Sequence, residues 1–170
     1  MYLPHEYAIL TAKTSEEFER FWSLCKPHLK AILDDPAAFS PAIPDDYTYF
    51  LDGEYLDAVK TLFERETDPL VPAFFCRDGE VIGFVSYVIY TSEDGKCFIL
   101  EYNIDAAHRN QGLGKLLFEL LCNHVSANGA KYFRLNCSNA DNERFWRNLG
   151  FAKVDLSEEG KNPEYTRPIP

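Results

Sequence analysis

The sequence predicts an α/β fold: a single domain whose mixed central β-sheet carries helices on both faces. Apolar runs of strand length alternate along the chain with segments whose apolar residues recur at helical spacing. An Asp78-Gly79 pair between two such runs is a strong signal for a hairpin turn. An apolar run at 98–104 leads through a glycine-containing turn into a helix-patterned segment at 113–125. The chain has 170 residues, which suits one domain with a sizeable core.

The N-terminal part is expected to form one strand and two helices. Residues 7–11 predict a short strand, and the capping box Thr14–Glu17 opens a segment with apolar residues at helical spacing. Pro27 lies inside this pattern, so the helix is expected to kink or end there. Residues 34–52 are rich in prolines and acids and predict a loop, and 53–66 predict a second helix.

Strands and helices then alternate to the C-terminus. Strands are expected at 70–76, 81–90, 97–104, 131–136 and 151–156, with hairpin turns at 77–80 and 91–96. Helices are expected at 140–149 and at 113–125, where Leu113, Leu116, Leu117, Leu120 and Leu121 form an apolar face. Asn128-Gly129 is a stop signal for the longer helix. Tyr165–Arg167 is expected to complete an edge strand, because prolines flank it.

The composition excludes several classes of protein. A net charge of −10 disfavours nucleic acid as a partner and mildly favours a cationic substrate. No apolar run approaches the ~18 residues of a membrane span. The five cysteines are scattered without a Cys-x-x-Cys pair, and the four histidines show no metal-ligand spacing, so we expect reduced core thiols and no metal. The first residues lack a basic region followed by an apolar one, so a cytoplasmic protein is expected.

The motif that carries chemistry runs from Arg109 to Gly114. It has the form Arg-x-x-Gly-x-Gly and lies between a strand and a helix. Free backbone N–H groups and the helix dipole at such a turn favour a phosphate. The motif is not a P-loop, because Leu116 follows Gly114-Lys115 where Ser or Thr is needed, and it lacks the third glycine of the dinucleotide fingerprint.

A second block, 139–151, contains an Asn cap, a short helix with the aromatic pair Phe145-Trp146, and a Gly-Phe pair that enters a strand. A Val-Ile-Gly-Phe-Val strand at 81–85 precedes both blocks. Together, over residues 70–157, these features resemble the GNAT superfamily of acyl-CoA-dependent N-acyltransferases. The resemblance implies that the fourth and fifth strands splay apart around the pantetheine arm of acetyl-CoA.

The resemblance also implies which residues hold acetyl-CoA. The pantetheine arm would pair with the backbone around Asn103, and the pyrophosphate would sit on the N–H groups of 111–115 beside Arg109. Asn139 would meet the pantetheine arm, and it is also a good N-cap for the helix that follows. The implied cofactor-binding residues are Tyr102, Asn103, Ile104, Arg109, Asn110, Gln111, Gly112, Leu113, Gly114, Lys115, Asn139 and Trp146.

For proton transfer, Glu101 is the predicted general base. Strand alternation predicts that Glu101 shares a face with Ile99 and Asn103, opposite Leu100, Tyr102 and Ile104. A carboxylate in an apolar strand is costly to bury unless it faces a cleft, although a solvated or hydrogen-bonded strand Glu is the alternative.

Trp146 stands where the family usually has the tyrosine that acts as the general acid. Indole can donate a hydrogen bond but does not titrate usefully. Trp146 therefore lines the thioester pocket, donates a hydrogen bond to a developing charge, or belongs to the core. Tyr102, Cys137 and Ser138 are weaker candidates for the acid.

The acceptor side is expected in residues 31–59, which hold Asp34, Asp35, Asp45, Asp46, Asp52, Glu54 and Asp57 but neither Lys nor Arg. These carboxylates would concentrate an ammonium group, and Tyr47, Tyr49, Phe50 and Tyr55 offer faces for cation–π contact. The alternative is a solvated acidic loop whose aromatic residues anchor it to the core.

The predicted function is transfer of an acetyl group from acetyl-CoA to a primary amine of a small molecule or peptide, by direct attack in a ternary complex. The alternative is a non-catalytic acyl-CoA-binding or sensor domain. The reason for this alternative is Trp146, which stands in place of the usual tyrosine. The domain 1–170 would comprise acceptor-side elements (2–69), an acetyl-CoA-binding core (70–157) and a C-terminal edge segment (158–170). A homodimer is implied only by analogy with the family.

Overall fold

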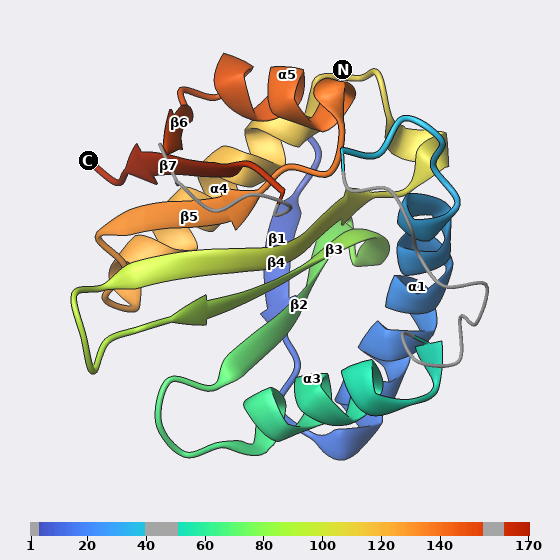
Figure 1. Cartoon of the computed structure of the whole chain (residues 1–170), viewed down its shortest axis with the longest axis vertical. Coiled ribbons are helices and arrows are strands. Elements are labelled where there is room, and N and C mark those ends of the chain that lie inside the picture. The colour runs from blue at the N-terminus through green and yellow to red at the C-terminus, as the bar shows by residue number, and fades with distance from the viewer. Residues whose placement is uncertain (1–3, 40–50, 155–161) are drawn as a thin grey trace.

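A seven-stranded sheet with the order β1-β2-β3-β4-β5-β7-β6 forms the centre of the fold (Figure 1). It comes from a computed structural model that describes residues 4–39, 51–154 and 162–170. The strands are β1 (Tyr7–Thr11), β2 (Leu70–Arg77), β3 (Glu80–Ile89), β4 (Lys96–Ile104), β5 (Tyr132–Asn136), β6 (Ala152–Val154) and β7 (Glu164–Pro168). The helices are α1 (Ser15–Leu33), α3 (Glu54–Glu64), α4 (Leu113–Ala127) and α5 (Ala140–Asn148). The mixed α/β fold is thereby confirmed.

Alternating residues of the central strands divide the core into two layers. Ala73 and Phe75 of β2 pack on the side of α4 and α5, whereas Phe74 and Cys76 pack on the side of α1 and α3. Figure 1 shows α1 and α3 together at one side of the molecule, apart from α4 and α5. The sheet is therefore covered on both faces, as the sequence predicts.

Helix α1 begins at the predicted capping box but does not end at Pro27. Thr14 Oγ1 accepts a hydrogen bond of 3.1 Å from the backbone N–H of Glu17, and the Glu17 carboxylate accepts one of 3.0 Å from the N–H of Thr14. The helix runs on to Leu33, with Pro27 on its exposed side. Its buried residues Cys25 and Leu29 lie on either side of the proline, so packing against the sheet outweighs the lost backbone hydrogen bond.

Two further expectations are wrong. Leu116 is 41% exposed, and the buried face of α4 instead includes Phe118 and Cys122. Strand β7 is not an edge strand, because it pairs with both β5 and β6. Pro163 lies just before the strand and Pro168 is its last residue, so neither proline interrupts the hydrogen-bond ladder.

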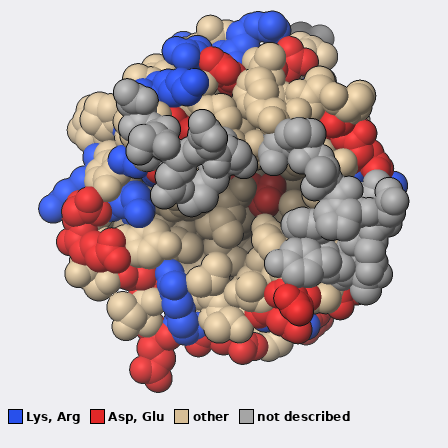
Figure 2. All heavy atoms as spheres, viewed as in Figure 1, with Lys and Arg blue, Asp and Glu red and all other residues tan. Residues whose placement is uncertain are grey.

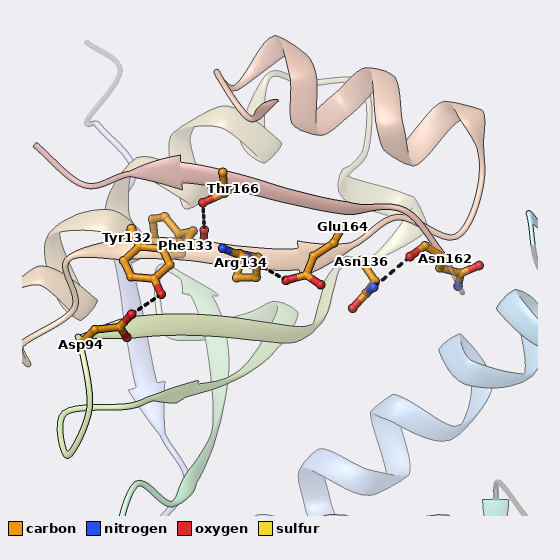
Figure 3. A network of polar contacts seen from close by, with 8 residues as sticks. All are labelled: Asp94, Tyr132, Phe133, Arg134, Asn136, Asn162, Glu164 and Thr166. Atoms are coloured by element: carbon orange, nitrogen blue, oxygen red, sulfur yellow. Dashed lines mark hydrogen bonds and ion pairs between the residues drawn. The ribbon is translucent and has the colours of Figure 1, made fainter. Parts of the chain in front are cut away.

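Polar side chains reinforce the pairing of β5 with β7 (Figure 3). Arg134 Nη1 lies 2.7 Å from Glu164 Oε1, and Thr166 Oγ1 donates a 2.9 Å hydrogen bond to the Phe133 carbonyl. At the end of β5, Asn136 Nδ2 donates to the Asn162 carbonyl. These contacts hold β5 against its antiparallel partner, on the side away from β4.

Strands β4 and β5 splay apart, as the resemblance implied. They are the parallel pair of the sheet, and their register within the described ranges covers only Lys96–Phe98 against Tyr132–Arg134. Strand β4 continues to Ile104, where β3 remains its neighbour. The second half of β4 therefore presents backbone groups that no ladder with β5 uses.

A β-bulge in β4 changes which face Glu101 occupies. Ser86 of β3 pairs with Glu101, but the next residue, Tyr87, pairs with Ile99, so Leu100 is the extra residue. Ile99 packs on the α4 side, whereas Leu100 packs on the α1 side. Glu101 reaches α1, so the expectation that it shares a face with Ile99 is wrong. Strict alternation fails here because the bulge adds one residue.

Candidate functional site

The turn before α4 has the geometry of an anion-binding loop. Gly112 precedes the helix with φ 74°, and Asn110 has φ 60°, so both residues adopt the left-handed region. No described side chain caps this helix end, and the first-turn N–H groups of a helix lack intrahelical partners. A Cβ added at Gly112 would meet no atom within 4 Å. Backbone donors, a positive dipole end and open space therefore coincide at this turn.

Aromatic residues from β4 and α5 hold the first turn of α4. A Cβ at Gly114 would lie 2.8 Å from Cε2 of Phe145, so only glycine lets this ring approach the helix so closely. Tyr102 Oη donates a hydrogen bond of 2.8 Å to the Gly114 carbonyl. The two positions of the motif therefore require glycine for different reasons: a left-handed backbone conformation at Gly112 and lack of space for a side chain at Gly114.

Arg109 is bound to the end of β4. Its Nε donates a 2.7 Å hydrogen bond to the Ile104 carbonyl, and its Nη2 donates one of 3.0 Å to Asn103 Oδ1. A guanidinium has five N–H donors, so these two bonds fix its position without using its whole capacity. The positive charge is held beside the turn at residues 110–114.

A cavity of about 760 Å³ lies over this loop, within the usual size range of small-molecule sites. Most of the predicted acetyl-CoA residues line it: Tyr102, Asn103, Ile104, Arg109, Asn110, Gly112, Leu113, Gly114, Lys115 and Asn139. Two do not. Gln111 directs its side-chain amide to the Ala107 carbonyl, and Trp146 lines a neighbouring cavity.

Asn139 is the N-cap of α5, which is one of the two roles that the sequence suggested for it. Its Oδ1 accepts a 2.8 Å hydrogen bond from the N–H of Asn142, and its Nδ2 donates one of 2.8 Å to Asp35. Asn139 thereby joins the start of α5 to the segment after α1 at the rim of the large cavity.

A smaller cavity of about 220 Å³ contains the predicted base. It is lined by residues from α1, β4, β5 and α5, and Glu101 is the sole carboxylate among the described residues of its lining. The two cavities share His28, Ile32, Tyr102 and Asn142, so they adjoin. Figure 2 shows a hollow on this face of the molecule with acidic atoms at its floor.

His28 is the partner of Glu101. The His28 Nε2 and Glu101 Oε2 atoms are 2.9 Å apart, and the side chains are 18% and 13% exposed. His28 is not among the residues predicted from the sequence, although a signal for it exists. Cys25, His28 and Ile32 recur at helical spacing, which places a histidine on the inward side of α1. The pairing itself joins residues 73 positions apart and has no local signature.

Glu101 influences two neighbours, the buried Cys25 and the partly buried Tyr55. Burial raises the pKa of the Cys25 thiol, and the Glu101 carboxylate raises it further. Burial likewise raises the pKa of the Tyr55 phenol, with Glu101 as the second cause. Both groups therefore stay protonated at neutral pH.

The two aromatic candidates for the acid lie in packed surroundings. Burial raises the pKa of Tyr102, and its hydroxyl proton is donated to the Gly114 carbonyl. Trp146 is 6% exposed, and its ring contacts those of Tyr102, Phe118 and Phe151 at centroid distances of 5.1 to 5.7 Å. Trp146 belongs to the core while it also lines the smaller cavity.

Lysines of α1 pair with two acids of the predicted acceptor segment. Lys26 Nζ lies 2.7 Å from Asp52, and Lys30 Nζ lies 2.7 Å from Asp34. These carboxylates are therefore partly neutralised. Asp45, Asp46, Tyr47, Tyr49 and Phe50 lie outside the described residues.

A third cavity, of about 770 Å³, contains none of the predicted site residues. Its lining includes Tyr87 and His124, whose Oη and Nε2 atoms are 2.9 Å apart. Burial lowers the pKa of His124. This cavity provides an internal comparison for the site at Glu101.

The described residues form neither a metal-binding group nor a membrane-spanning helix. Across residues 4–39, 51–154 and 162–170, no three His, Cys, Asp or Glu side chains form a metal-binding group. All five cysteines are free and buried. None of the described helices is long and apolar enough to cross a membrane.

Comparisons with known proteins agree with this geometry. The family model described as "Acetyltransferase (GNAT) family" matches residues 29–151. No curated protein matches the chain.

Solved structures share the fold at low sequence identity. An acetyltransferase of the GNAT family from Staphylococcus aureus Mu50 is 14% identical, with 97% of this chain and 100% of that chain covered and a TM-score of 0.63. An acetyltransferase from Thermus thermophilus is 18% identical, with 98% of each chain covered and a TM-score of 0.63. The ribosomal-protein-S18-alanine N-acetyltransferase from Escherichia coli is 16% identical, with coverage of 96% and 94% and a TM-score of 0.57.

Proposed function

The chain belongs to the acetyltransferase (GNAT) family, and from this premise we propose that it transfers an acetyl group from acetyl-CoA to a primary amine of a small molecule or peptide. One observation carries the proposal. A cavity over an uncapped helix start adjoins a smaller cavity whose described lining holds a single carboxylate, Glu101. The first suits a phosphate-bearing donor, and the second suits a cationic acceptor.

On the donor side, the backbone around Gly112 is proposed to hold the pyrophosphate. The N–H groups of residues 111–115 lie at the positive end of the α4 dipole, and Arg109 adds a fixed positive charge. The open space around Gly112 lets an anion approach the backbone. A pantetheine arm contains amides, which would pair with the second half of β4 as an added strand.

On the acceptor side, Glu101 is proposed to drive deprotonation of the amine. With a lysine-like pKa of ~10.4, only about one amine in ~2,500 is neutral at pH 7. The Glu101 carboxylate attracts the ammonium form into the site and favours transfer of its proton, either as the base itself or by stabilising a neighbouring group that takes the proton. Its low exposure strengthens this electrostatic effect, because less water screens it.

The leaving thiolate is proposed to depart without a dedicated acid. A thiol has a pKa of only ~8.5, so its anion is a tolerable leaving group near neutral pH. The contacts of Tyr102 and Trp146 support this view. Tyr102 already donates its proton to the Gly114 carbonyl, and Trp146 is packed among aromatic rings. We therefore propose that both residues shape the site rather than supply a proton.

The test has two arms. Calorimetric titration with acetyl-CoA is expected to show micromolar binding. Release of free thiol is then measured with ethylamine, butylamine, phenethylamine, spermidine and a short peptide with a free N-terminus. Turnover with any of them excludes the non-catalytic alternative. Binding without turnover across the panel would favour that alternative, and absence of binding would contradict the proposed function.

A further inference from the structure

We propose that His28 is the group that takes the proton from the acceptor amine, and that Glu101 is its positioning partner. This inference rests on the proposed function and assigns the base within the same site. It is carried by the contact between the two side chains and by where each lies relative to the two cavities.

The hydrogen bond fixes the form of the imidazole. An ionised carboxylate only accepts hydrogen bonds, so at 2.9 Å the His28 Nε2 atom must carry the hydrogen that Glu101 Oε2 accepts. In the neutral ring, Nδ1 then keeps its lone pair. A carboxylate placed in this way orients the ring and stabilises the imidazolium that forms when Nδ1 takes a proton.

The position of His28 favours it over Glu101 as the group that meets the substrate. His28 lines both the large and the small cavity, whereas Glu101 lines only the small one. The amine nitrogen must reach the thioester where the two cavities join. The ring is further fixed by Phe84, which it meets edge-on at a centroid distance of 5.5 Å and an interplanar angle of 83°.

The titratable groups near this pair come from α1, α3 and β4 and from the segment after α1. Cys25 lies on the same face of α1 and Tyr55 approaches from α3, and both stay protonated at neutral pH for the reasons given above. Tyr102 of β4 is likewise kept neutral by burial. Asp35, at the far end of α1, accepts a hydrogen bond from Asn139.

Two proton transfers accompany the proposed acyl transfer. The ammonium group passes one proton to His28 Nδ1 and becomes a neutral amine, while the ring becomes an imidazolium paired with the Glu101 carboxylate. The amine nitrogen then attacks the thioester carbonyl carbon. The C–N bond forms, the C–S bond breaks, and the thiolate leaves with the electron pair of that bond. The nitrogen gives up its second proton to this thiolate, so the products are a neutral amide and a thiol. The imidazolium returns its proton to solvent through the open large cavity.

The kinetic test uses His28→Gln with two comparison proteins, the parent and a matched control variant. Gln keeps an N–H donor for Glu101 but takes up no proton near neutral pH. With acetyl-CoA and the best amine of the panel, kcat of His28→Gln is expected to fall by about 100-fold or more, the usual contribution of a general base. The KM for acetyl-CoA should stay unchanged. His124→Gln is the matched control, because His124 makes an equivalent 2.9 Å contact in the third cavity.

The pH profile separates a base from a structural residue. In the parent protein and in His124→Gln, kcat should fall with decreasing pH as the imidazole becomes protonated. That acid limb should be missing in His28→Gln. A His28→Gln variant that keeps kcat within about threefold of the parent, with the acid limb intact, would overturn the proposal and leave Glu101 as the base.

A second measurement needs no turnover. NMR of isotope-labelled histidine, with the His28 signals assigned by their loss in His28→Gln, is expected to show the Nε2–H tautomer at alkaline pH. The Nδ1–H tautomer would overturn the proposal, because Nδ1 would then have no lone pair. If the tautomer is as expected but no amine in the panel is acetylated, the pairing is correct while the proposed function fails, and His28 is not a base.

Discussion

The proposed donor side and the proposed acceptor side of this site are built in opposite ways. The proposed donor side is a continuous stretch, Arg109–Lys115, that would act through backbone N–H groups and one fixed charge. The proposed acceptor side depends on two side chains, His28 and Glu101, that come from a helix and a strand 73 positions apart. A local turn can be recognised from its residues, whereas a contact between distant elements exists only in the folded chain.

The comparison also predicts different consequences of mutation. Damage to the donor side should weaken acetyl-CoA binding. Damage to the acceptor side should slow turnover while acetyl-CoA still binds.

Gly112→Glu is expected to weaken acetyl-CoA binding most. The substitution places a negative charge where the pyrophosphate would sit and forces a side chain into φ 74°. Like charges in contact cost several kcal/mol, so the affinity should fall by at least about 100-fold. Calorimetric titration measures it.

Gly112→Ala is the matched control for this change. Its Cβ meets no atom within 4 Å, so only the backbone conformation is strained. We expect a loss of about 1 kcal/mol in the free energy of unfolding and a small loss of affinity. Equal affinities for the Glu and Ala variants would contradict an anion site at this turn.

Glu101→Gln is expected to slow turnover by about 100-fold while the calorimetric affinity for acetyl-CoA stays within about twofold. The amide keeps the shape of the side chain but removes the charge that stabilises the protonated partner. Steady-state kinetics with the best amine acceptor measure the change. A parallel loss of acetyl-CoA affinity would show that the donor and acceptor sides are not separable.

Arg109→Gln should reduce acetyl-CoA affinity by about tenfold, because a hydrogen bond to a charged group contributes about 1.5 kcal/mol or more. The control is Arg147→Gln, which removes an arginine from the exposed side of α5, where it pairs with Glu143 at 2.8 Å. Calorimetry of both variants checks the effect. Equal losses would mean that the effect reflects the overall charge of the protein.

Tyr102→Phe should have the smallest effect. It removes the hydrogen bond to the Gly114 carbonyl and is expected to lower the free energy of unfolding by about 1 kcal/mol. Thermal denaturation measures this loss, and turnover should stay within about threefold because no proton is assigned to this hydroxyl. A drop in kcat without a loss of stability would restore Tyr102 as the acid.

The residues proposed for the donor side could be selected from the sequence because their signals are local. The Gly112–Gly114 pair, the strand before it and the Asn139 cap each depend on neighbouring residues, and the structure brings most of them to one cavity. The splay of β4 and β5 followed from the family resemblance and is confirmed by their short shared register.

The surroundings of Glu101 were predicted less well because tertiary contacts determine them. The bulge at Leu100 puts Glu101 on the face of Leu100 instead of that of Ile99, and no composition signal marks a bulge. Pro27 does not end α1, because burial of Cys25 and Leu29 maintains the helix on either side of it. His28 lies beyond Pro27 on this continuous helix, and its contact with Glu101 joins residues 73 positions apart.

The most direct test of the proposed donor site is the change in backbone amide NMR signals when acetyl-CoA is added to the intact protein. We expect the largest changes at Tyr102–Ile104 and Arg109–Lys115, around the cavity of about 760 Å³. The cavity of about 770 Å³ at Tyr87 and His124 is of equal size but lacks this loop. Changes that concentrate there, with the loop signals unmoved, would contradict the assignment of the donor site.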